Sequence, residues 1–337
     1  MSESNLLTKI EEAGLVGRGG ASFPVHLKWQ RIKSLSNPKK YVVCNASEGE
    51  PGVKKDFHVL KNFTAEVFKG MLLTMDFLES KEAYLNINQN YYRELKEKID
   101  PLIAICQKKG YLINIFEEEP SYIGGETGAL LNAIEGKKTE PRSSSPSPSL
   151  TGIFGCPTLV HNVETFYDVA KVADGTFKAT RFSTLIGVKN PGVYEVLNTQ
   201  KIAEILRETN NYPDFTFFVQ VGGGASGEIL TAEQAENHEL IGCGSIEVFA
   251  LETKPQEFLS KLFSFYAKES CGKCTPCRDG SWQLKKIITE LEQNSEIPWN
   301  KISPIIQAMD KSSFCDLGRS IALPVRSYAK NILGIEV

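Results

Sequence analysis

Three cysteines stand close together near the C-terminal end of the chain, in the spacing Cys-x-x-Cys-x-x-Cys. They are Cys271, Cys274 and Cys277. Three thiolates at this spacing can bind three corners of one iron–sulfur cube, and a fourth ligand must come from elsewhere in the chain. Cys315 is the candidate, because no other cysteine follows residue 277. The pattern therefore predicts a [4Fe–4S] cluster held by these four cysteines.

Zinc and free thiols are the alternatives to a cluster at these cysteines. Structural zinc sites usually combine two Cys-x-x-Cys pairs or add histidines, and the histidines all lie far from residue 271 in the sequence: His26, His58, His161 and His238. Disulfide bonds are improbable in a large cytosolic chain. The other cysteines stand singly in or beside apolar stretches and are typical of small buried side chains: Cys44, Cys106, Cys156 and Cys243.

A glycine-rich segment near the N-terminus could approach a phosphate group. Residues 17–20 carry three glycines and precede a predicted helix over residues 25–33. Glycines let backbone N–H groups come close to an anion, and Arg18 and Lys28 add positive charge. The segment matches neither the Gly-x-Gly-x-x-Gly fingerprint nor the P-loop, so a flexible loop without a ligand is the alternative.

Two further segments combine glycine with acidic or polar residues directly after predicted strands. Residues 45–52 follow the first predicted strand, and residues 122–128 follow the third and open a helix. Open α/β sheets bind ligands at the carboxyl ends of their strands. Solvated surface is the alternative for the acidic residues of segment 45–52. Because a cluster moves single electrons, we expect a two-electron site for flavin or nicotinamide on the same chain.

Alternating strand and helix signals position these segments. Short apolar or alternating runs predict strands, and longer runs with helical spacing predict helices between them. This order indicates a mostly parallel, Rossmann-like α/β sheet. The predicted strands cover residues 40–44, 82–87 and about 112–116; the predicted helices cover residues 58–79 and about 91–109, and another begins near Val160.

The second half of the chain changes character. Residues 139–149 are rich in Pro and Ser and predict a loop. From about residue 182 to 251, short strands around glycine turns indicate a small β-rich module. Residues from about 255 to 337 return to helical periodicity, with the cysteine cluster between helices.

The composition is that of an ordinary soluble protein. The 337 residues include 38 Lys and Arg against 41 Asp and Glu, for a net charge of −3, which argues against a nucleic-acid binder. No apolar run approaches the ~18–20 residues of a membrane span, and the N-terminus lacks the apolar segment of a signal peptide. We therefore expect a cytoplasmic protein, or the peripheral arm of a membrane-associated complex, without direct membrane insertion.

The segments and their order resemble the flavin-bearing, NADH-oxidising F-type subunit of respiratory complex I. The same family includes the diaphorase subunits of NAD-reducing or electron-bifurcating hydrogenases and formate dehydrogenases. The resemblance covers essentially all of residues 10–335. The residues that carry it are Gly17–Pro24 with Leu27–Trp29, Asn45–Asp56, Tyr122–Glu126, Ile134–Lys137, Pro141–Arg142, Gly155–Thr158, Asn162–Thr165 and Glu269–Arg278 with Cys315–Gly318.

The resemblance implies an α/β domain for FMN and nicotinamide over residues 1–177, a ubiquitin-like β-grasp (SLBB-type) module over 178–253, and a helical [4Fe–4S] domain over 254–337. It implies FMN and a [4Fe–4S] cluster as cofactors and NADH or NADPH as substrate. No side chain need act as acid or base, because the chemistry belongs to the cofactors. By similarity Phe23 stacks near the nicotinamide and Glu50 contacts the dinucleotide. The flavin pocket would be lined by Gly17, Arg18, Gly19, Gly20, Lys28, Asn45, Glu48, Tyr122, Gly125, Glu126, Asn162 and Thr165.

Several residues depart from the family pattern in the nucleotide site. Ser47 stands where the family carries a flavin-site aspartate. Gly124 and Thr127 replace a cysteine and a glutamate of the family's Tyr-Ile-Cys-Gly-Glu-Glu-Thr. The loop at residues 144–148 lacks a lysine and a phenylalanine that stacks on adenine, and Arg31 stands at a further aromatic position.

Two hypotheses follow from these departures, with drift and compensating contacts as a third. Loss of the carboxylate at 127 could favour NADPH, with Arg31 or Lys138 attracting its 2′-phosphate. Alternatively, the lost contacts leave nicotinamide binding weak or absent, and the chain is an electron-relay or structural subunit or uses another donor.

The partners implied are a thioredoxin-like [2Fe–2S] subunit and a further iron–sulfur or catalytic subunit. These partners would be of complex I, hydrogenase or formate dehydrogenase type. The resemblance implies an NAD(P)H dehydrogenase (diaphorase)-type oxidoreductase subunit.

Overall fold

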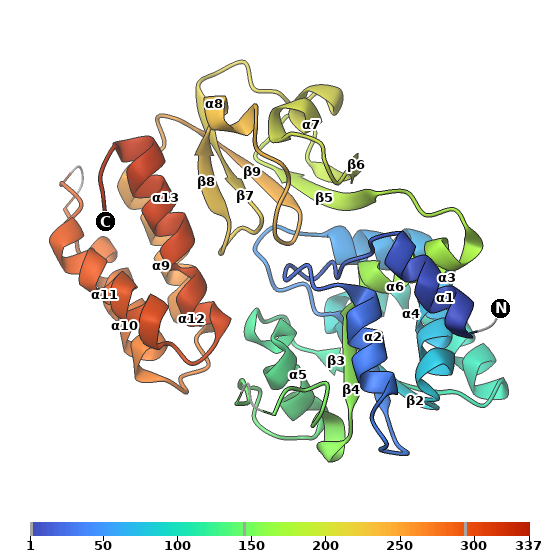
Figure 1. The fold of residues 1–337 in the computed structure, drawn as a ribbon. Helices are drawn as coiled ribbons and strands as arrows, with labels where there is room; N and C mark the ends of the chain where they lie inside the picture. The colour runs from blue at the N-terminus through green and yellow to red at the C-terminus, as the bar shows by residue number, and fades with distance from the viewer. Residues whose placement is uncertain (1–2, 144–145, 293–294) are drawn as a thin grey trace. The chain divides into compact units, whose positions relative to one another are not determined.

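The computed structural model describes residues 3–143, 146–292 and 295–337. The chain forms two compact units (Figure 1). The first unit contains the residues up to Gly49 together with Lys54–Arg181, and the second contains Glu50–Val53 and Phe182–Val337. Within the described residues, no helix is both long enough and apolar enough to span a bilayer.

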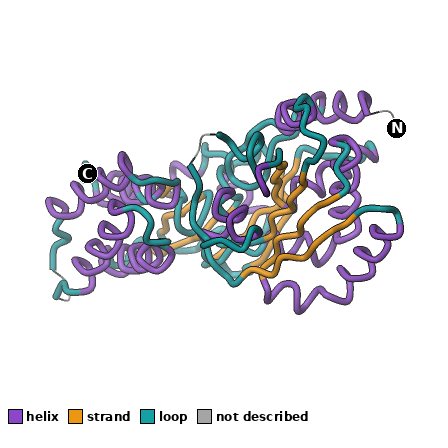
Figure 2. The backbone as a smooth tube through the Cα atoms, turned by 90° about the horizontal axis from the view of Figure 1, so that it is seen from below, coloured by secondary structure: helices purple, strands orange, loops and turns teal. Residues whose placement is uncertain are grey.

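A four-stranded parallel sheet forms the centre of the first unit. Its strands are β1 (Tyr41–Ala46), β2 (Glu82–Asn88), β3 (Leu112–Glu118) and β4 (Thr158–Asn162), in the order β3-β2-β1-β4. Figure 2 shows these strands among the helices that connect them. Strands β2 and β3 follow one another on one side of β1, and β4 lies on the other side of β1. The gap between β1 and β4 is therefore the topological switch point of the sheet, where such sheets bind ligands.

The helices of the first unit cover this sheet. They are α1 (Glu3–Glu12), α2 (Val25–Lys33), α3 (Lys55–Leu78), α4 (Gln89–Lys108), α5 (Thr127–Ile134) and α6 (Val163–Asp174), with short 3₁₀ turns at Ile123–Gly125 and Ile153–Gly155. Helices α3 and α6 pack at very close range, since a Cβ atom at Gly70 would stand 1.9 Å from the carbonyl oxygen of Phe166. Glycine at this position permits the close approach of the two helices.

The segment around Val160 differs from the sequence-based expectation. The sequence predicts a helix that begins near Val160, but Thr158–Asn162 forms strand β4 and helix α6 begins at Val163. The run of buried residues pairs with β1 in parallel, which satisfies its backbone groups inside the sheet. Asn162 then caps the helix, because its side chain accepts a hydrogen bond from the Glu164 N–H.

A mixed sheet lies in the second unit. Its strands are β5 (Thr180–Ile186), β6 (Gly192–Leu197), β7 (Phe217–Val221), β8 (Glu228–Thr231) and β9 (Ser245–Ala250), in the order β6-β5-β9-β7-β8. Strands β5 and β9 are parallel, whereas β7 is antiparallel to both β8 and β9. Helices α7 (Ile202–Glu208) and α8 (Ala232–Ala235) complete this part, and buried aliphatic side chains fill its core.

The described residues from 255 onward form further helices of the second unit: α9 (Pro255–Glu269), α10 (Thr275–Thr289), α11 (Trp299–Ser312), α12 (Asp316–Ser320) and α13 (Ala322–Leu333). Aromatic rings join them to the sheet, with Phe258 on α9 stacked on Tyr328 of α13 at 4.3 Å and edge-on to Phe218 of β7 at 5.8 Å between ring centroids. The N–H of Ile229 on β8 also donates to Ser327 Oγ on α13 (2.9 Å). The parallel α/β sheet and the helix-covered mixed sheet agree with the predicted fold class at this level.

Candidate functional site

The carboxyl ends of the four parallel strands carry a row of polar side chains. Asn45 is in β1, Asn86 in β2, Glu118 at the end of β3 and Asn162 at the end of β4. Asn45 lies opposite both Asn86 and Asn162 in the strand pairing. The row therefore lies at the switch point, which is where an open parallel sheet binds its ligand.

Asn45 is the centre of a hydrogen-bond network at this edge. Its Oδ1 accepts from the Ser47 N–H (3.1 Å) and from Asn86 Nδ2 (3.2 Å). Its Nδ2 donates to the carbonyl oxygen of Gly125 (3.1 Å). Asn86 Nδ2 also donates to Glu118 Oε2 (2.9 Å). The network fixes the Asn45 amide and ties three strand ends to Gly125.

The glycine-rich loop, residues 17–23, lies beside the end of β4. The N–H of its first residue donates to the carbonyl oxygen of Phe23 (2.9 Å), which closes the loop. Gly20 has a φ of +107°, a conformation that favours glycine. A Cβ atom at Gly19 would stand 3.6 Å from the Asn162 Cβ. Phe23, which was predicted to stack near the nicotinamide, is 52% exposed.

Arg18 anchors this loop to α6. Its backbone N–H donates to Thr165 Oγ1 (2.9 Å), and its guanidinium donates to Asp168 Oδ2 and to the Thr180 carbonyl oxygen, both at 2.8 Å. Burial raises the pKa of Asp168 to about 7, and the Arg18 charge opposes that rise. The structure therefore places the predicted pocket residues Arg18 and Thr165 in the support of the loop, buried in the protein.

A second buried charge cluster lies where α3 begins. Lys55 Nζ is 2.6 Å from Asp56 Oδ1 and 3.0 Å from both Glu164 Oε2 and Asn162 Oδ1. Asn162 Nδ2 donates to Asp56 Oδ2 (2.8 Å). The buried Lys55–Asp56 ion pair thus fixes the orientation of the amide of Asn162, which is another predicted pocket residue.

Glu48 closes the N-terminus of α3. Its carboxylate accepts from the N–H groups of Asp56 (2.6 Å) and Phe57 (3.1 Å) and from the Tyr91 hydroxyl (2.8 Å). Burial and, next, the neighbouring Asp56 charge raise the pKa of Glu48 to about 7. A carboxylate on these N–H groups stabilises the helix end. The Glu48 side chain therefore fixes segment 45–52 to the start of α3.

Lys28 and Trp29 on α2 both contact β4. Lys28 Nζ donates to the carbonyl oxygen of Val160 (2.6 Å), and Trp29 Nε1 donates to His161 Nε2 (3.1 Å). Burial lowers the pKa of Lys28 to about 8. Burial also lowers the pKa of His161 well below its usual range, so that the imidazole accepts as a neutral ring. Lys28 is therefore a partly buried cation beside the end of β4.

The segment that follows β3 passes close to the segment that follows β1. A Cβ atom at Gly49 would stand 2.5 Å from Tyr122 Cα, so glycine permits this approach. Glu126 caps α5, with its Oε2 accepting from the Ala129 N–H (2.8 Å). Tyr122, Gly125 and Glu126 thus come from one short turn that meets the carboxyl end of β1.

The structure places Glu50 in the second unit. Its carboxylate accepts from the Ala225 N–H (3.0 Å) and from the Ser226 hydroxyl (2.7 Å) in the loop between β7 and β8. A Cβ atom at Gly223 would stand 2.7 Å from Glu50 Oε1, so the loop fits closely around the carboxylate. The expected contact of Glu50 with a dinucleotide stays a prediction.

Arg31, Lys138 and Thr127 are the residues from which the hypotheses on NADH or NADPH preference started. Arg31 is exposed on α2, and Lys138 Nζ lies 3.1 Å from Glu140 Oε2. Thr127 is the first residue of α5. In the loop at residues 144–148, residues 144–145 lie outside the described residues.

Two helix starts bring the four cysteines of the motif together. Cys274 and Cys315 are the N-cap residues of α10 and α12, Cys277 lies in the first turn of α10, and Cys271 precedes it. The Cys277 Sγ is 3.4 Å from Ser270 Oγ. Burial raises the pKa of Cys277 to about 11, and the other three thiols each add to that rise. The thiols of Cys271, Cys274 and Cys315 therefore lie near that of Cys277.

A close-packed wall surrounds the cysteines. A Cβ atom at Gly318 would stand 2.2 Å from Ser313 Oγ and 3.0 Å from the Cys277 Cβ. The N–H of Phe314 donates to Cys274 Sγ (3.4 Å). Across the described ranges, no three Cys, His, Asp or Glu side chains converge closely enough for a single metal ion. A four-iron cube binds each thiolate to a different iron, so its ligands stand further apart than those of one ion. Four thiols at the starts of two helices are the donor set that such a cube requires.

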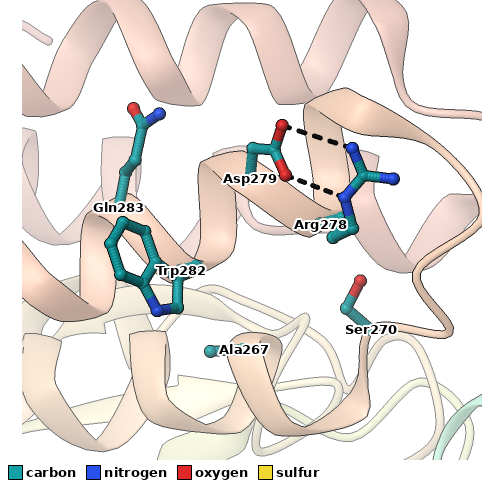
Figure 3. A pocket seen from close by; sticks show the side chains of 6 residues that line it. All are labelled: Ala267, Ser270, Arg278, Asp279, Trp282 and Gln283. Atoms are coloured by element: carbon teal, nitrogen blue, oxygen red, sulfur yellow. Dashed lines mark hydrogen bonds and ion pairs between the residues drawn. The ribbon is translucent and has the colours of Figure 1, made fainter.

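A cavity of about 390 Å³ adjoins the cysteines. It is lined by Ala267, Ser270, Arg278, Asp279, Trp282 and Gln283 (Figure 3). Ser270 contacts both the cavity and the Cys277 sulfur. Trp282 is 58% exposed, and Lys286 Nζ lies 5.3 Å from the centroid of its ring. The middle of α10 therefore presents an aromatic ring to solvent.

Comparison with known proteins agrees with both candidate centres. Residues 10–171 match the family model of the Nuo51 FMN-binding domain, and residues 257–332 match that of the NADH-ubiquinone oxidoreductase-F iron-sulfur binding region. The F-type subunit of NADH-quinone oxidoreductase in Buchnera aphidicola subsp. Acyrthosiphon pisum is 31% identical over 87% of this chain and 75% of its own length. The chain belongs to the family of these F-type subunits.

Other relatives and solved structures extend over nearly the whole chain. The F-type subunit of NADH-quinone oxidoreductase in Streptomyces coelicolor is 28% identical over 98% of this chain and 82% of its own length. A crystal structure of NAD+-reducing [NiFe]-hydrogenase superposes with a TM-score of 0.89 at 29% identity over 98% of this chain. The chain spans 61% of the length of that hydrogenase chain. The predicted family, the FMN and [4Fe–4S] cofactors and the oxidoreductase class are confirmed.

The first unit fits the FMN of this family. Ser47 Oγ is buried and, within the described part of the chain, has no hydrogen-bond partner. A Cβ atom at Gly125 would stand 3.7 Å from that oxygen. A buried hydroxyl without a partner costs free energy, so this space suits a polar group of a ligand. Lys28 and the glycine-rich loop supply the positive charge and room that a phosphate needs.

Sequence reasoning missed two residues of the strand-end row, Asn86 and Glu118. Asn86 is the fifth residue of an alternating strand, and its position near the carboxyl end of β2 was a usable signal. Glu118 stands in a run of three glutamates that resembles solvated surface, and only the structure shows it 7% exposed.

Proposed function

We propose that NADH is oxidised at the switch point of the first unit and that the electrons leave through the cysteine-bound cluster of the second. The row of Asn45, Asn86, Glu118 and Asn162 at the strand ends carries this proposal, because it gives the sheet a polar, oriented ligand edge. Membership of the F-type family and the match to an NAD+-reducing hydrogenase support the same substrate.

The proposed roles of the chain's residues are binding and orientation. Lys28 and the glycine-rich loop, residues 17–23, would hold the FMN phosphate. The Asn45 amide and the Ser47 hydroxyl would face the flavin ring system, and Phe23 would cover the nicotinamide. When bound, FMN accepts a hydride and releases its electrons one at a time, which is chemistry the protein itself does not supply.

The iron–sulfur ligands are proposed to be Cys271, Cys274, Cys277 and Cys315. Cys274 and Cys315 stand at the N-terminal ends of α10 and α12, and helix N-termini favour negative charge such as that of a thiolate cluster. Gly318 permits the close packing of Ser313 and Cys277 beside these ligands, since a Cβ atom there would stand 2.2 Å from Ser313 Oγ and 3.0 Å from the Cys277 Cβ.

The proposed division of the chain has three parts. Residues 1–177 would form the FMN and nicotinamide domain, residues 178–253 the ubiquitin-like β-grasp module, and residues 254–337 the helical bundle with the cluster. The mixed sheet β5–β9 with α7 and α8 supports the second assignment, and the helices α9–α13 support the third.

We further propose that the chain works in the peripheral arm of a multi-subunit complex on the cytoplasmic side. Its partners would be a thioredoxin-like [2Fe–2S] subunit and another iron–sulfur subunit. The exposed Trp282 at the cavity beside Ser270 offers an anchor for such a partner, since Trp is enriched among the residues that dominate interface energies.

The test is an anaerobic titration of the purified chain, loaded with FMN and iron–sulfur cluster, with NADH and then NADPH. Bleaching of the flavin absorbance by NADH supports the proposal. Preferential bleaching by NADPH would instead assign the site to the phosphorylated nucleotide. If dithionite bleaches the flavin and neither nucleotide does, the chain is a relay subunit and the proposal fails. The variant C315S separates the two centres, because it should lose the cluster's signal and keep bleaching by NADH.

A further inference from the structure

Glu118 is a buried carboxylate at the flavin edge of the sheet that the family pattern does not explain. It is 7% exposed. Asn86 Nδ2 donates to its Oε2 (2.9 Å), and the Ser121 hydroxyl donates to its Oε1 (3.3 Å). Burial raises the pKa of Glu118, and these donors oppose the rise by favouring its charged form. Among the residues that the structure describes, no lysine, arginine or histidine forms an ion pair with it.

The Glu118 side chain fills the space of a side chain at position 124. A Cβ atom at Gly124 would stand 1.2 Å from Glu118 Oε1 and 2.5 Å from its Cδ. The two residues are therefore sterically linked, because Glu118 keeps this position only while residue 124 is glycine. Glycine at 124 has an ordinary backbone conformation, so the reason for it is room and not φ.

Glu118 acts on the pocket through two amides. Asn86 has one NH₂ group, which donates both to Glu118 and to Asn45 Oδ1. That choice leaves the Asn45 Nδ2 for the carbonyl oxygen of Gly125. The negative charge thereby fixes the orientation of both amides at the end of β1.

Ser47 lies beside the same carboxylate. Its hydroxyl is near enough to favour the charged form of Glu118, although it makes no hydrogen bond among the described residues. A second carboxylate at position 47 would repel Glu118, since two buried carboxylates at close range cannot both ionise. Positions 47 and 118 together can therefore hold one ionised carboxylate, and Glu118 is that carboxylate in this chain.

We propose that Glu118 is a positioning residue that supplies a fixed negative charge at this end of the flavin pocket, and that residue 124 is glycine because the Glu118 carboxylate occupies the space of a side chain there. The inference rests on the proposed function, because it takes FMN to bind at the strand ends. A fixed negative charge in a water-poor site disfavours the more electron-rich, reduced form of a bound group. Glu118 therefore weakens the binding of reduced FMN relative to oxidised FMN.

The first experiment compares the wild type with E118Q and with E117Q in the FMN-loaded chain. Residue 117 is the adjacent, exposed glutamate of the same strand, so E117Q makes the same charge change outside the pocket. The flavin midpoint potential is measured by spectroelectrochemistry, and the FMN dissociation constant by flavin fluorescence. We expect E118Q to favour reduced over oxidised FMN about tenfold, equivalent to about 30 mV for a two-electron couple, and E117Q to change neither quantity. Equal potentials in E118Q and wild type overturn the inference.

A second experiment moves the carboxylate from position 118 to position 47 by mutation. S47D alone should bind FMN more weakly than the wild type, whereas S47D/E118Q should restore the wild-type potential because it moves the charge and keeps its number. If S47D/E118Q keeps the raised potential of E118Q, the position of the carboxylate matters more than its charge and the inference fails.

The third arm needs no cofactor. G124A should lower the unfolding midpoint of the wild type, and it should lower that of E118A much less, because the added Cβ atom then meets only Ser121 Oγ, at 2.8 Å. Equal losses in both backgrounds would place Glu118 elsewhere and overturn the inference. A wild type that binds no FMN under any condition overturns the proposed function, whereas bound FMN with an unchanged potential in E118Q overturns this inference alone.

Discussion

Replacement of Lys28 by methionine should stabilise the FMN-free protein and weaken FMN binding. Lys28 is held partly buried on α2, with its Nζ 2.6 Å from the Val160 carbonyl oxygen. Burial lowers its pKa from 10.5 to about 8, so at neutral pH the folded chain keeps a cation that the unfolded chain solvates more favourably. Methionine fills a similar volume without the charge.

The magnitude and sign follow from the pKa of Lys28. A fall from 10.5 to about 8 corresponds to about 3 kcal/mol of destabilisation by the charged lysine. Loss of the hydrogen bond to Val160 destabilises the variant by about 1 kcal/mol. The net effect is that K28M should be more stable than the wild type by about 2 kcal/mol at pH 7. The penalty is complete below pH 8 and is relieved as the pH rises from 8 toward 10.5, because the folded lysine then loses its proton first. At pH 9.5 the advantage of K28M should be close to zero.

Urea unfolding of the FMN-free chain at pH 7 and pH 9.5 measures this difference, and flavin fluorescence measures FMN affinity. A charged hydrogen bond to phosphate is worth about 1.5–3 kcal/mol, so K28M should bind FMN about ten- to a hundredfold more weakly. K33M is the control on the same helix: Lys33 Nζ pairs with Glu79 Oε1 at 3.0 Å, and removal of such a surface pair changes stability by less than about 1 kcal/mol. A K28M protein less stable than wild type at pH 7, or equally stabilised at both pH values, would refute the reasoning.

Two more predictions concern the cluster wall and the anchor of the loop. G318A should bind substantially less iron per chain than wild type, because its Cβ would stand 2.2 Å from Ser313 Oγ; G334A, which changes a glycine with φ of +69° at the end of α13, should keep full iron content. R18M should lose about 3–5 kcal/mol of unfolding free energy at pH 8, because Asp168 is left buried without its cation. That loss should shrink at pH 5, since Asp168 has a pKa of about 7 and is then neutral in the folded state; a loss equal at both pH values contradicts this.

Much of the first unit was predictable because its elements are local patterns. The helix over residues 25–33 has the predicted bounds, and the strand Glu82–Asn88 differs from its prediction by one residue. Val160 shows the limit: a five-residue segment with two apolar side chains, Leu159 and Val160, suits a strand or a helix start, and pairing with a distant strand decides between them. The sequence contains no local signal for that pairing.

The candidate site was predictable in its residues and less so in their roles. Arg18 carries the charge that suggests a phosphate ligand, yet its guanidinium binds Asp168, a residue 150 positions away. Glu118 shows the reverse error: its neighbours in sequence are exposed glutamates, which predicts a surface residue, yet its own side chain is buried at the strand ends. In both cases the deciding partner is distant in sequence, and side-chain direction depends on it.

The division of the chain has a consequence for its assembly. Residues 50–53 belong to the second unit while residues on both sides of them belong to the first, so the polypeptide crosses between the units three times. A single cut near residue 181 therefore cannot separate two complete units. A fragment starting at residue 182 would lack Glu50 and leave the N–H of Ala225 and the hydroxyl of Ser226 without their acceptor. The ribosome delivers this acceptor long before the loop that binds it, so the last half of the chain completes a structure begun in the first.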